Sequence, residues 1–480
     1  MKKGIEPEIS PGNHAKQSSV YSVWRALVNS IRGSEADYTQ INIGKALFLL
    51  AVPMVLELVM ESTFAVVDIY FVGTLGASAV ATVGLTETYL FLLYSIAMGL
   101  SVAVTAIIAR RIGEKEKEKA GITAVQSIVI ALFVSLPFAL AGIFFAKDLL
   151  SLMGADSWVL NHGYHYAQWM LGGNVVIVML FIINAIFRGA GDPAIAMRVL
   201  WIANGINIIL DPLLILGLGP FPKLGIEGAA IATNIGRGIG VLTQLWLLFR
   251  GGKHIKVIRS YLYLNWKIIS RIVRTSLGGI GQMIVAMTSW IFIVRILAEF
   301  GSEVVAGSTI ALRIMMFTMT PAWGMSNAVA TLVGQNLGAK KPDRAEKSVW
   351  ITGIWNMIFL IAVSIFYFFN SESLMGIFTD DTTVISIGSE WLRIVSYSYF
   401  VYGWWMVSVQ AFNGAGDTVT PTKINLVFFW LIEIPLSYFM AETLGMKYSG
   451  VYWAILIAET SVGLFTLWLF SKGKWKKAVI

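Results

Sequence analysis

Long apolar runs, each bounded by polar or glycine-rich residues, dominate the pattern along this chain of 480 residues. A helix needs roughly 20 consecutive apolar residues to cross the hydrocarbon core of a bilayer. Runs of that length predict twelve spanning helices, over residues 45–73, 87–109, 120–146, 163–187, 195–218, 226–249, 268–298, 308–334, 348–369, 386–412, 420–443 and 449–471. An even number of spans places both ends of the chain on one side of the membrane.

Lysine and arginine lie almost entirely in alternate connections between these spans. Of the 36 basic residues, the opposite set of loops holds only Lys147, Lys223 and Lys447. Short basic loops stay in the cytoplasm, so we expect a multi-pass protein of a bacterial or archaeal cytoplasmic (inner) membrane with both termini cytoplasmic. A wrong span count would scramble this alternation, so the charges also support twelve spans.

Composition narrows the class further. Apolar residues make up 56% of the chain and charged residues 13%, which is too much apolar surface for a soluble protein to bury. The net charge of +8 is explained by topology, so we expect the lipid bilayer as partner and no nucleic acid. There is no cysteine, the four histidines are scattered, and no nucleophile constellation or phosphate-binding loop is visible. We therefore expect neither an enzyme nor a bound cofactor.

The chain is an internal repeat. Three landmarks keep one offset of 225 residues, namely Gly76 with Gly301, Gly113 with Gly338, and FRGAGD at 187–192 with FNGAGD at 412–417. Each half has six spans and so enters the membrane with the same polarity, which defines a parallel repeat. The fold class is thus an all-α polytopic membrane protein of two pseudo-symmetric six-helix bundles.

The repeat divides the chain into five parts. We expect a cytoplasmic N-tail with an interfacial helix, an N-terminal lobe, a cytoplasmic crossover loop, a C-terminal lobe and a basic cytoplasmic tail, over residues 1–44, 45–250, 251–267, 268–471 and 472–480. The interfacial helix is suggested by apolar residues at helical spacing between Val20 and Ile31. A disordered tail is the alternative.

The first span carries three acids, Glu57, Glu61 and Asp68, on one helix face. Acids inside a membrane are costly and face protein or water rather than lipid. Either this face binds protons or cations in a hydrated pocket, or its acids are paired with intramembrane arginines. Both readings stay open at this point.

A second polar group lies at a similar depth. Asn207 and Asp211 share a face of the fifth span, and Thr233 lies about as deep in the sixth. Together with Asp68 they would offer hard oxygen ligands to Na⁺ or carboxylates to a shared proton. A simple hydrogen-bonded core is the alternative. In the second half, Ile293 occupies the position equivalent to Asp68, which confines the expected site to the N-terminal lobe.

Several segments resemble the MATE family, the multidrug and toxic compound extrusion transporters. They are VVDIYFVGTLG (66–76), NAIFRGAGD (184–192), NIILDP (207–212), TLVGQNLGAKKPDRA (331–345) and AFNGAGDTVTP (411–421). The likeness extends over about residues 45 to 471. It implies a MATE-like fold and an antiporter that exports organic cations or drugs by alternating access while Na⁺ or H⁺ enters.

The resemblance also implies site residues. Asp68 would carry the coupling ion, Na⁺ or H⁺, with Asn207, Asp211 and Thr233 as partners, and Asn184 would join them. Glu61 would face the drug cavity. We add Glu57, on the same face as Glu61, and Gln282, which occupies the position of Glu57 in the second half, as candidate substrate contacts.

One alternative function remains, a lipid-linked oligosaccharide flippase of the same superfamily. The acidic face of the first span disfavours such an anionic substrate. Twelve spans suffice for one transport unit, so we expect a monomer.

Overall fold

The computed structural model describes residues 24–34, 36–252 and 254–478, and this part of the chain is helical almost throughout and contains no strand. Eight of the membrane passes are single long helices: α2 (Ile43–Gly73), α3 (Ala77–Gly113), α4 (Lys117–Leu152), α7 (Pro193–Leu216), α8 (Ile226–Arg250), α9 (Trp266–Ala298), α10 (Ser302–Gly338) and α11 (Pro342–Met375). A ninth is α16 (Lys447–Ser471).

Three passes are built from shorter pieces. The first comprises the π-helix η1 (Val159–Gly163), α5 (Tyr164–Gly172) and α6 (Asn174–Ala190); the second comprises α12 (Thr382–Ser396) and α13 (Tyr399–Ala415); the third comprises α14 (Val419–Asn425), η3 (Leu426–Glu433), α15 (Ile434–Tyr438) and η4 (Phe439–Thr443). Short 3₁₀ turns, η2 (Arg259–Tyr261) and η5 (Lys474–Lys477), lie outside the passes. The prediction of twelve spans is confirmed.

Ten of these passes are long and apolar enough to cross a membrane by length and composition. The other two are α8, which carries Glu227 and Arg237, and the α12–α13 pass, which breaks at Tyr397 and Ser398. Many helices extend beyond the predicted apolar run. The helix predicted to begin at residue 87 begins at Ala77, because the backbone continues to coil past the stretch that lipid contacts.

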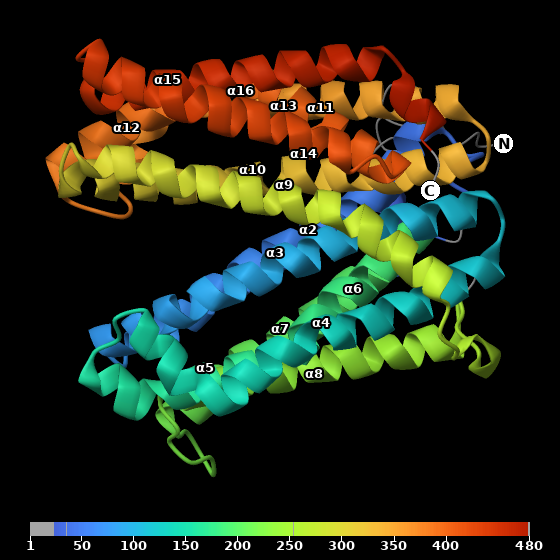
Figure 1. The fold of residues 1–480 in the computed structure, drawn as a ribbon, viewed down its shortest axis with the longest axis horizontal. Coiled ribbons are helices and arrows are strands. Elements are labelled where there is room, and N and C mark those ends of the chain that lie inside the picture. The colour runs from blue at the N-terminus through green and yellow to red at the C-terminus, as the bar shows by residue number, and fades with distance from the viewer. Residues whose placement is uncertain (1–23, 35, 253, 479–480) are drawn as a thin grey trace, which may run out of the picture.

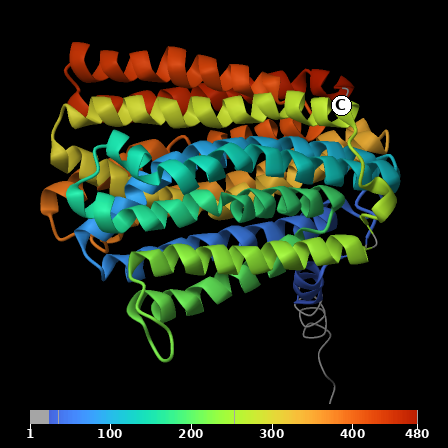
Figure 2. The ribbon, with the colours of Figure 1, turned by 60° about the horizontal axis from the view of Figure 1, so that its bottom comes forward.

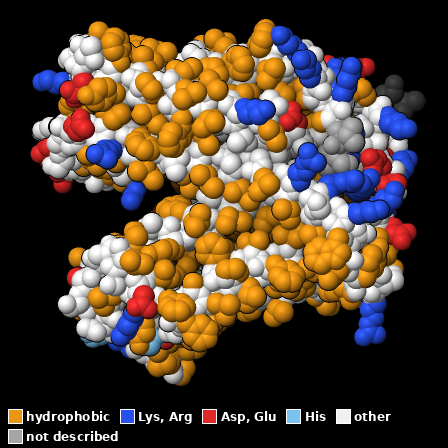
Figure 3. Space-filling view, in the orientation of Figure 1, with side chains coloured by type: hydrophobic (Ala, Val, Ile, Leu, Met, Phe, Trp, Pro, Cys, Tyr) orange, Lys and Arg blue, Asp and Glu red, His pale blue; other side chains and the backbone are white. Residues whose placement is uncertain are grey.

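The helices form two lobes around a wedge-shaped cleft. One lobe holds α2 to α8 and the other α9 to α16, and the long helices run from one end of the molecule to the other (Figures 1 and 2). The lobes meet at the end where both described chain ends lie and separate at the opposite end (Figure 3). Lysine and arginine gather where the lobes meet, so we call this the basic end and the other the open end.

The seam between the lobes follows the internal repeat. A Cβ atom added to Gly113 on α3 would lie 2.0 Å from the carbonyl oxygen of Gln335 on α10, and one added to Gly338 would lie 2.2 Å from that of Arg110. Arg110 and Gln335 are themselves 225 residues apart. The two contacts are thus the same contact made once by each half.

A second reciprocal pair lies deeper in the seam. A Cβ at Gly99 would lie 2.3 Å from the backbone nitrogen of Ile280, and one at Gly324 would lie 2.5 Å from Cγ2 of Val55. Val55 and Ile280 are again related by the repeat. We call these four contacts the glycine crossings. Only a residue without a side chain permits helices to approach so closely.

The segment before α2 contacts the second lobe at the basic end. A helix over residues 24–32 precedes α2, and Trp24 on it is 60% exposed. Val20, part of the predicted interfacial pattern, lies outside the described residues. The loop before α2 is held by the second lobe, because the Lys341 ammonium donates to the carbonyl of Thr39 at 3.0 Å and Arg344 donates to that of Tyr38 at 3.1 Å.

Candidate functional site

Polar groups of α7 and α8 meet inside the N-terminal lobe. Asn207 and Asp211 lie one turn apart on α7, and Thr233 faces them from α8. The side-chain amide of Asn207 donates to the Thr233 hydroxyl at 3.0 Å. All three side chains are buried, and Asp211 is fully enclosed. The depth count is thus correct in placing Asn207 beside Thr233, and the binding of a coupling ion by these residues stays a prediction.

Asp211 is buried without compensation. Among the residues that the structure describes, no group donates a hydrogen bond to either carboxylate oxygen of Asp211 or to the amide oxygen of Asn207. No lysine or arginine in that set forms an ion pair with Asp211 or Asp68. A buried carboxylate without a partner is costly. Three unpartnered buried oxygens suit a small cation or a proton.

Asp68 approaches this group from α2. It is half-buried, its charge repels that of Asp211, and it is itself repelled by Glu87 and attracted by Arg237 without forming an ion pair. Two carboxylates in mutual repulsion bind a cation or share a proton more readily than either would alone. We call Asp68, Asn207, Asp211 and Thr233 the carboxylate cluster.

Glu57 belongs to a different group. Its carboxylate accepts a hydrogen bond from Asn184 at 3.1 Å and lies 3.7 Å from the guanidinium of Arg188. Gln244 in turn donates to Asn184. The structure thus corrects the expected grouping of Asn184 with Asp68: Asn184 binds Glu57, about three turns of α2 nearer the basic end.

Glu61 forms the second acid–arginine pair. The guanidinium of Arg237 donates to one carboxylate oxygen at 2.8 Å, and Asn204 donates to the other at 3.0 Å. The guanidinium also lies over the ring of Phe64, 5.5 Å from its centroid. The sequence left two interpretations of the acids in the first span, ion binding or pairing with arginines. Pairing holds for Glu57 and Glu61, which lie against arginines, whereas neither Asp68 nor Asp211 forms such a pair among the described residues.

Both pairs line one small cavity of about 80 Å³. This has room for a few water molecules and is below the roughly 300 Å³ of a typical ligand pocket. Two glutamates face two arginines in it, so its charge balances. The acids of the first span alone disfavour an anionic substrate, but Arg188 and Arg237 line the same cavity and offset their charge.

Gln282 occupies a packed position in the second lobe. Its amide donates to Asn413 at 3.0 Å and to the carbonyl of Thr418 at 3.0 Å, and it accepts a hydrogen bond from Asn413 at 3.3 Å. It is 3% exposed, and its amide is committed to these partners. The repeat explains the contact, since Gln282 and Asn413 stand where Glu57 and Arg188 stand in the first half. The predicted substrate contact at Gln282 does not fit this position.

Sequence reasoning missed two charged residues. The predicted span 163–187 places Arg188 in a loop, yet its side chain reaches back to Glu57. The predicted span 87–109 begins at Glu87, but this residue lies ten residues inside α3 and its charge acts on Asp68. For Arg188 the signal was its place beside the GAGD motif, directly opposite Asn413 in the repeat.

The pairing of Glu61 predicts a stability effect. Glu61→Gln leaves the Arg237 guanidinium, 7% exposed, without its ionic partner. We expect a loss of about 3 kcal/mol, the lower end for a broken buried pair, because Glu61 itself is 35% exposed. Thermal unfolding followed by intrinsic fluorescence measures it. The matched control is Glu372→Gln, whose pair with Arg393 is exposed and worth at most about 1 kcal/mol. Equal shifts in both variants would contradict the buried pair.

A helical membrane protein with two pseudo-symmetric lobes around a cleft, and unpartnered buried oxygens in one lobe, has the architecture of a membrane transporter. The MatE family model matches residues 53–213 and 279–439, one segment in each lobe, and the chain belongs to this family. MATE proteins are multidrug efflux transporters, so the expected class is confirmed.

Curated relatives match over nearly the whole chain. The probable multidrug resistance protein YoeA of Bacillus subtilis is 26% identical over 448 residues, which cover 92% of this chain and 96% of the relative. The probable multidrug resistance protein NorM of Thermotoga maritima is 26% identical, covering 91% and 94%. A protein named FAD transporter, of Shewanella oneidensis, is 25% identical, covering 89% and 94%.

Solved structures show the same fold. A structure described as the outward-facing conformation of a multidrug resistance MATE family transporter superposes with a TM-score of 0.85 at 24% identity, covering 92% of this chain and 98% of that one. A transporter from Pyrococcus furiosus, whose title reports reverse polarity of the binding pocket, gives a TM-score of 0.85 at 23% identity with the same coverage.

Proposed function

We propose that this protein is a cation-coupled antiporter that exports organic cations or drugs while Na⁺ or H⁺ enters. The single observation that carries the proposal is the fully buried carboxylate of Asp211, whose two oxygens have no donor within the described residues. Such a group must bind a cation or take up a proton to be tolerated in a membrane interior. Membership of a multidrug efflux family supports the direction of drug movement.

The carboxylate cluster is the proposed coupling site. Asp68 and Asp211 would supply carboxylate oxygens, and Asn207 and Thr233 would supply an amide and a hydroxyl oxygen. Hard oxygen ligands of this kind suit Na⁺, and the same carboxylates suit a proton. Asn184 stands outside this set, since it binds Glu57.

The substrate would bind in the cleft between the lobes. Glu61 is the acid best placed to meet a cationic substrate, since it is 35% exposed while Glu57 is 7% exposed. We propose that the basic end faces the cytoplasm, because it gathers the lysines and arginines. The open end would then release substrate to the outside.

One observation favours the alternative function, a lipid-linked oligosaccharide flippase. Arg188 and Arg237 line the same cavity as Glu57 and Glu61 and could meet an anionic group once their pairs open. Binding of a lipid-linked sugar to the purified protein, lost in Arg237→Gln, would favour this function over drug export.

The deciding experiment uses proteoliposomes that hold the purified chain and a fluorescent cationic dye. An inward Na⁺ gradient and an inward pH gradient are imposed separately. We expect dye transport under one or both gradients and none without a gradient. Transport that is equal with and without the gradients would overturn coupling.

A further inference from the structure

A further cavity lies at the basic end, away from the carboxylate cluster. It has a volume of about 370 Å³, within the range of ligand pockets. Its walls come from five separate segments: the loop before α2, the end of α3, the start of α4, the crossover loop and the end of α10. The first lobe, the second lobe and both connecting segments therefore enclose one space.

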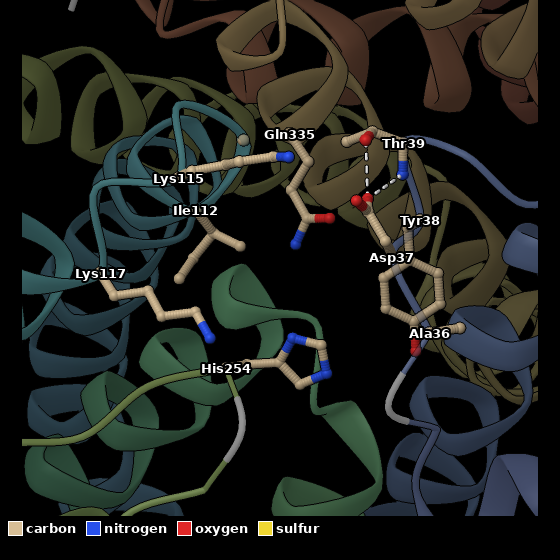
Figure 4. A pocket seen from close by; sticks show the side chains of 10 residues that line it. Ala36, Asp37, Tyr38, Thr39, Ile112, Lys115, Lys117, His254 and Gln335 are labelled. Atoms are coloured by element: carbon tan, nitrogen blue, oxygen red, sulfur yellow. Dashed lines mark hydrogen bonds between the residues drawn. The ribbon is translucent and has the colours of Figure 1, made fainter.

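Four of the side chains that line this space carry nitrogen donors. Figure 4 shows the ammonium of Lys117, the imidazole of His254 and the amide nitrogen of Gln335 around one hollow, with the ammonium of Lys115 at its edge beside Gln335. The amide nitrogen of Gln335 also donates to the carbonyl of Gly189 at 3.2 Å. Lysine ammoniums and amide nitrogens of this kind bind phosphate oxygens. The ring of Tyr38 stacks on His254, with 6.4 Å between centroids, and closes one wall.

The acid in the wall is already engaged. Asp37 accepts hydrogen bonds from the backbone and hydroxyl of Thr39, at 2.9 and 2.6 Å, and from Gln40 at 2.9 Å. Burial opposes its ionisation, but the Thr39 hydrogen bonds and the charges of Lys115 and Lys341 outweigh burial and hold the pKa of Asp37 below its ordinary value. A second acid, Asp192, lies 3.9 Å from His254.

The repeat provides a comparison. Gln335 lines the cavity, and its counterpart in the other half is Arg110. The guanidinium of Arg110 donates to the carbonyl of Ala478, so the equivalent place on the other side is covered by the C-terminal segment of the chain. There the buried ring of Trp475 stacks on Phe470. The two halves thus differ. The C-terminal segment covers the place beside Arg110, whereas the place beside Gln335 is a cavity lined by nitrogen donors.

We propose that this cavity, which we call the seam pocket, binds a phosphate-bearing anion, supplied either by a lipid headgroup or by a free phosphate compound. Because its walls belong to both lobes, a bound anion joins them at the basic end. Occupation then favours the form in which this end is closed and the other is open. The seam pocket is a regulatory site separate from the transport site.

Binding is tested first, with inorganic pyrophosphate titrated calorimetrically into the purified full-length protein in neutral detergent. The pocket variant is Lys115→Gln with Lys117→Gln. The matched control is Lys340→Gln with Lys347→Gln: it removes the same charge at the same end, and Lys340 shares the left-handed backbone of Lys115, with φ of 58° and 62°. We expect dissociation constants at least tenfold weaker in the pocket variant and unchanged in the control.

The lobe distance distinguishes the sources of phosphate. The chain has no native cysteine, so Glu118→Cys with Asp343→Cys places one spin label on each lobe. Spectra are compared in nanodiscs of phosphatidylcholine alone, of the same lipid with pyrophosphate, and with added phosphatidylglycerol. A shift to the short distance with pyrophosphate indicates a soluble anion, and a shift only with phosphatidylglycerol indicates a lipid headgroup. No shift in either arm, or the same shift in the pocket variant, overturns the proposal.

A separate measurement guards against a pocket variant that does not fold. Ala36→Cys, which labels the cavity wall and keeps both lysines, is modified with a charged thiol reagent, and the rate is compared with and without the anion that gave the shift. Binding in the seam pocket slows the modification at least severalfold. An unchanged rate overturns the proposal.

Discussion

Replacing Asp211 by asparagine is expected to abolish ion-driven export and, at the same time, to make the protein more stable in the absence of the coupling ion. The carboxylate is fully buried and has no donor among the described residues. Its charge is therefore a cost to the folded state that only a bound cation or proton relieves. The neutral amide removes that cost, which we expect to be on the order of 1–3 kcal/mol, and with it the means of coupling.

Two measurements check this result. Dye export from proteoliposomes should fall to the level of empty vesicles, and the melting temperature without Na⁺ at alkaline pH should rise by a few degrees. Na⁺ or acid should stabilise the wild type and not the variant. The control is Asp148→Asn, an exposed acid near the end of α4. Full export by Asp211→Asn would refute the coupling site, and a less stable variant would mean that the charge is compensated.

Adding one methyl group at Gly99 is expected to force the lobes apart at the basic end. In the present form the new Cβ would lie 2.3 Å from the nitrogen of Ile280, a separation that no real contact tolerates. Overpacking of this kind costs about 1–3 kcal/mol. Applied to a two-state equilibrium, that cost shifts the populations about 5- to 150-fold away from the form with a closed basic end. Transport should fall because one of its two states is depleted.

The label pair at Glu118 and Asp343 reports the effect as a longer distance in Gly99→Ala. The control is Gly84→Ala on the same helix, where an added Cβ meets nothing within 4 Å. Gly324→Ala should repeat the result, since Gly324 makes the equivalent crossing with Val55. A distance distribution like that of the wild type in both crossing variants would show that the seam adapts, and the glycine crossings would then have no gating role.

The sequence predicts the number of spans and the repeat because both leave strong local marks. Apolar length reports what lipid contacts, and alternating lysines and arginines report which loops share a side. Helix ends are less visible, as at Ala77, because a helix that emerges from lipid carries the same polar residues as a loop. The glycine crossings leave no such mark. Gly113 and Gly338 define the repeat, but only the fold shows that each glycine contacts the residue three positions before the other glycine.

Part of the carboxylate cluster can be predicted from the sequence for a similar reason. Depth along straight helices is a simple function of residue count, and it correctly places Asn207 beside Thr233. The acid–arginine pairs cannot be predicted from depth along the helices. A long arginine side chain spans more than one turn, so Arg188 at the end of α6 reaches Glu57 although its backbone belongs to the end of the pass. Counting backbone depth therefore fails for residues whose charged group lies far from Cα.

The glycine crossings have a mechanical consequence. Among the described residues, no ion pair between an acid and a lysine or arginine joins the two lobes. Lys341 and Arg344 donate to backbone carbonyls of the loop before α2. At the glycine crossings, by contrast, the halves meet through closely fitting backbone surfaces, which separate without leaving an uncompensated charge behind. Contact that depends on shape in this way should respond weakly to ionic strength, so we expect the packing at the glycine crossings to be the same at low and at high salt.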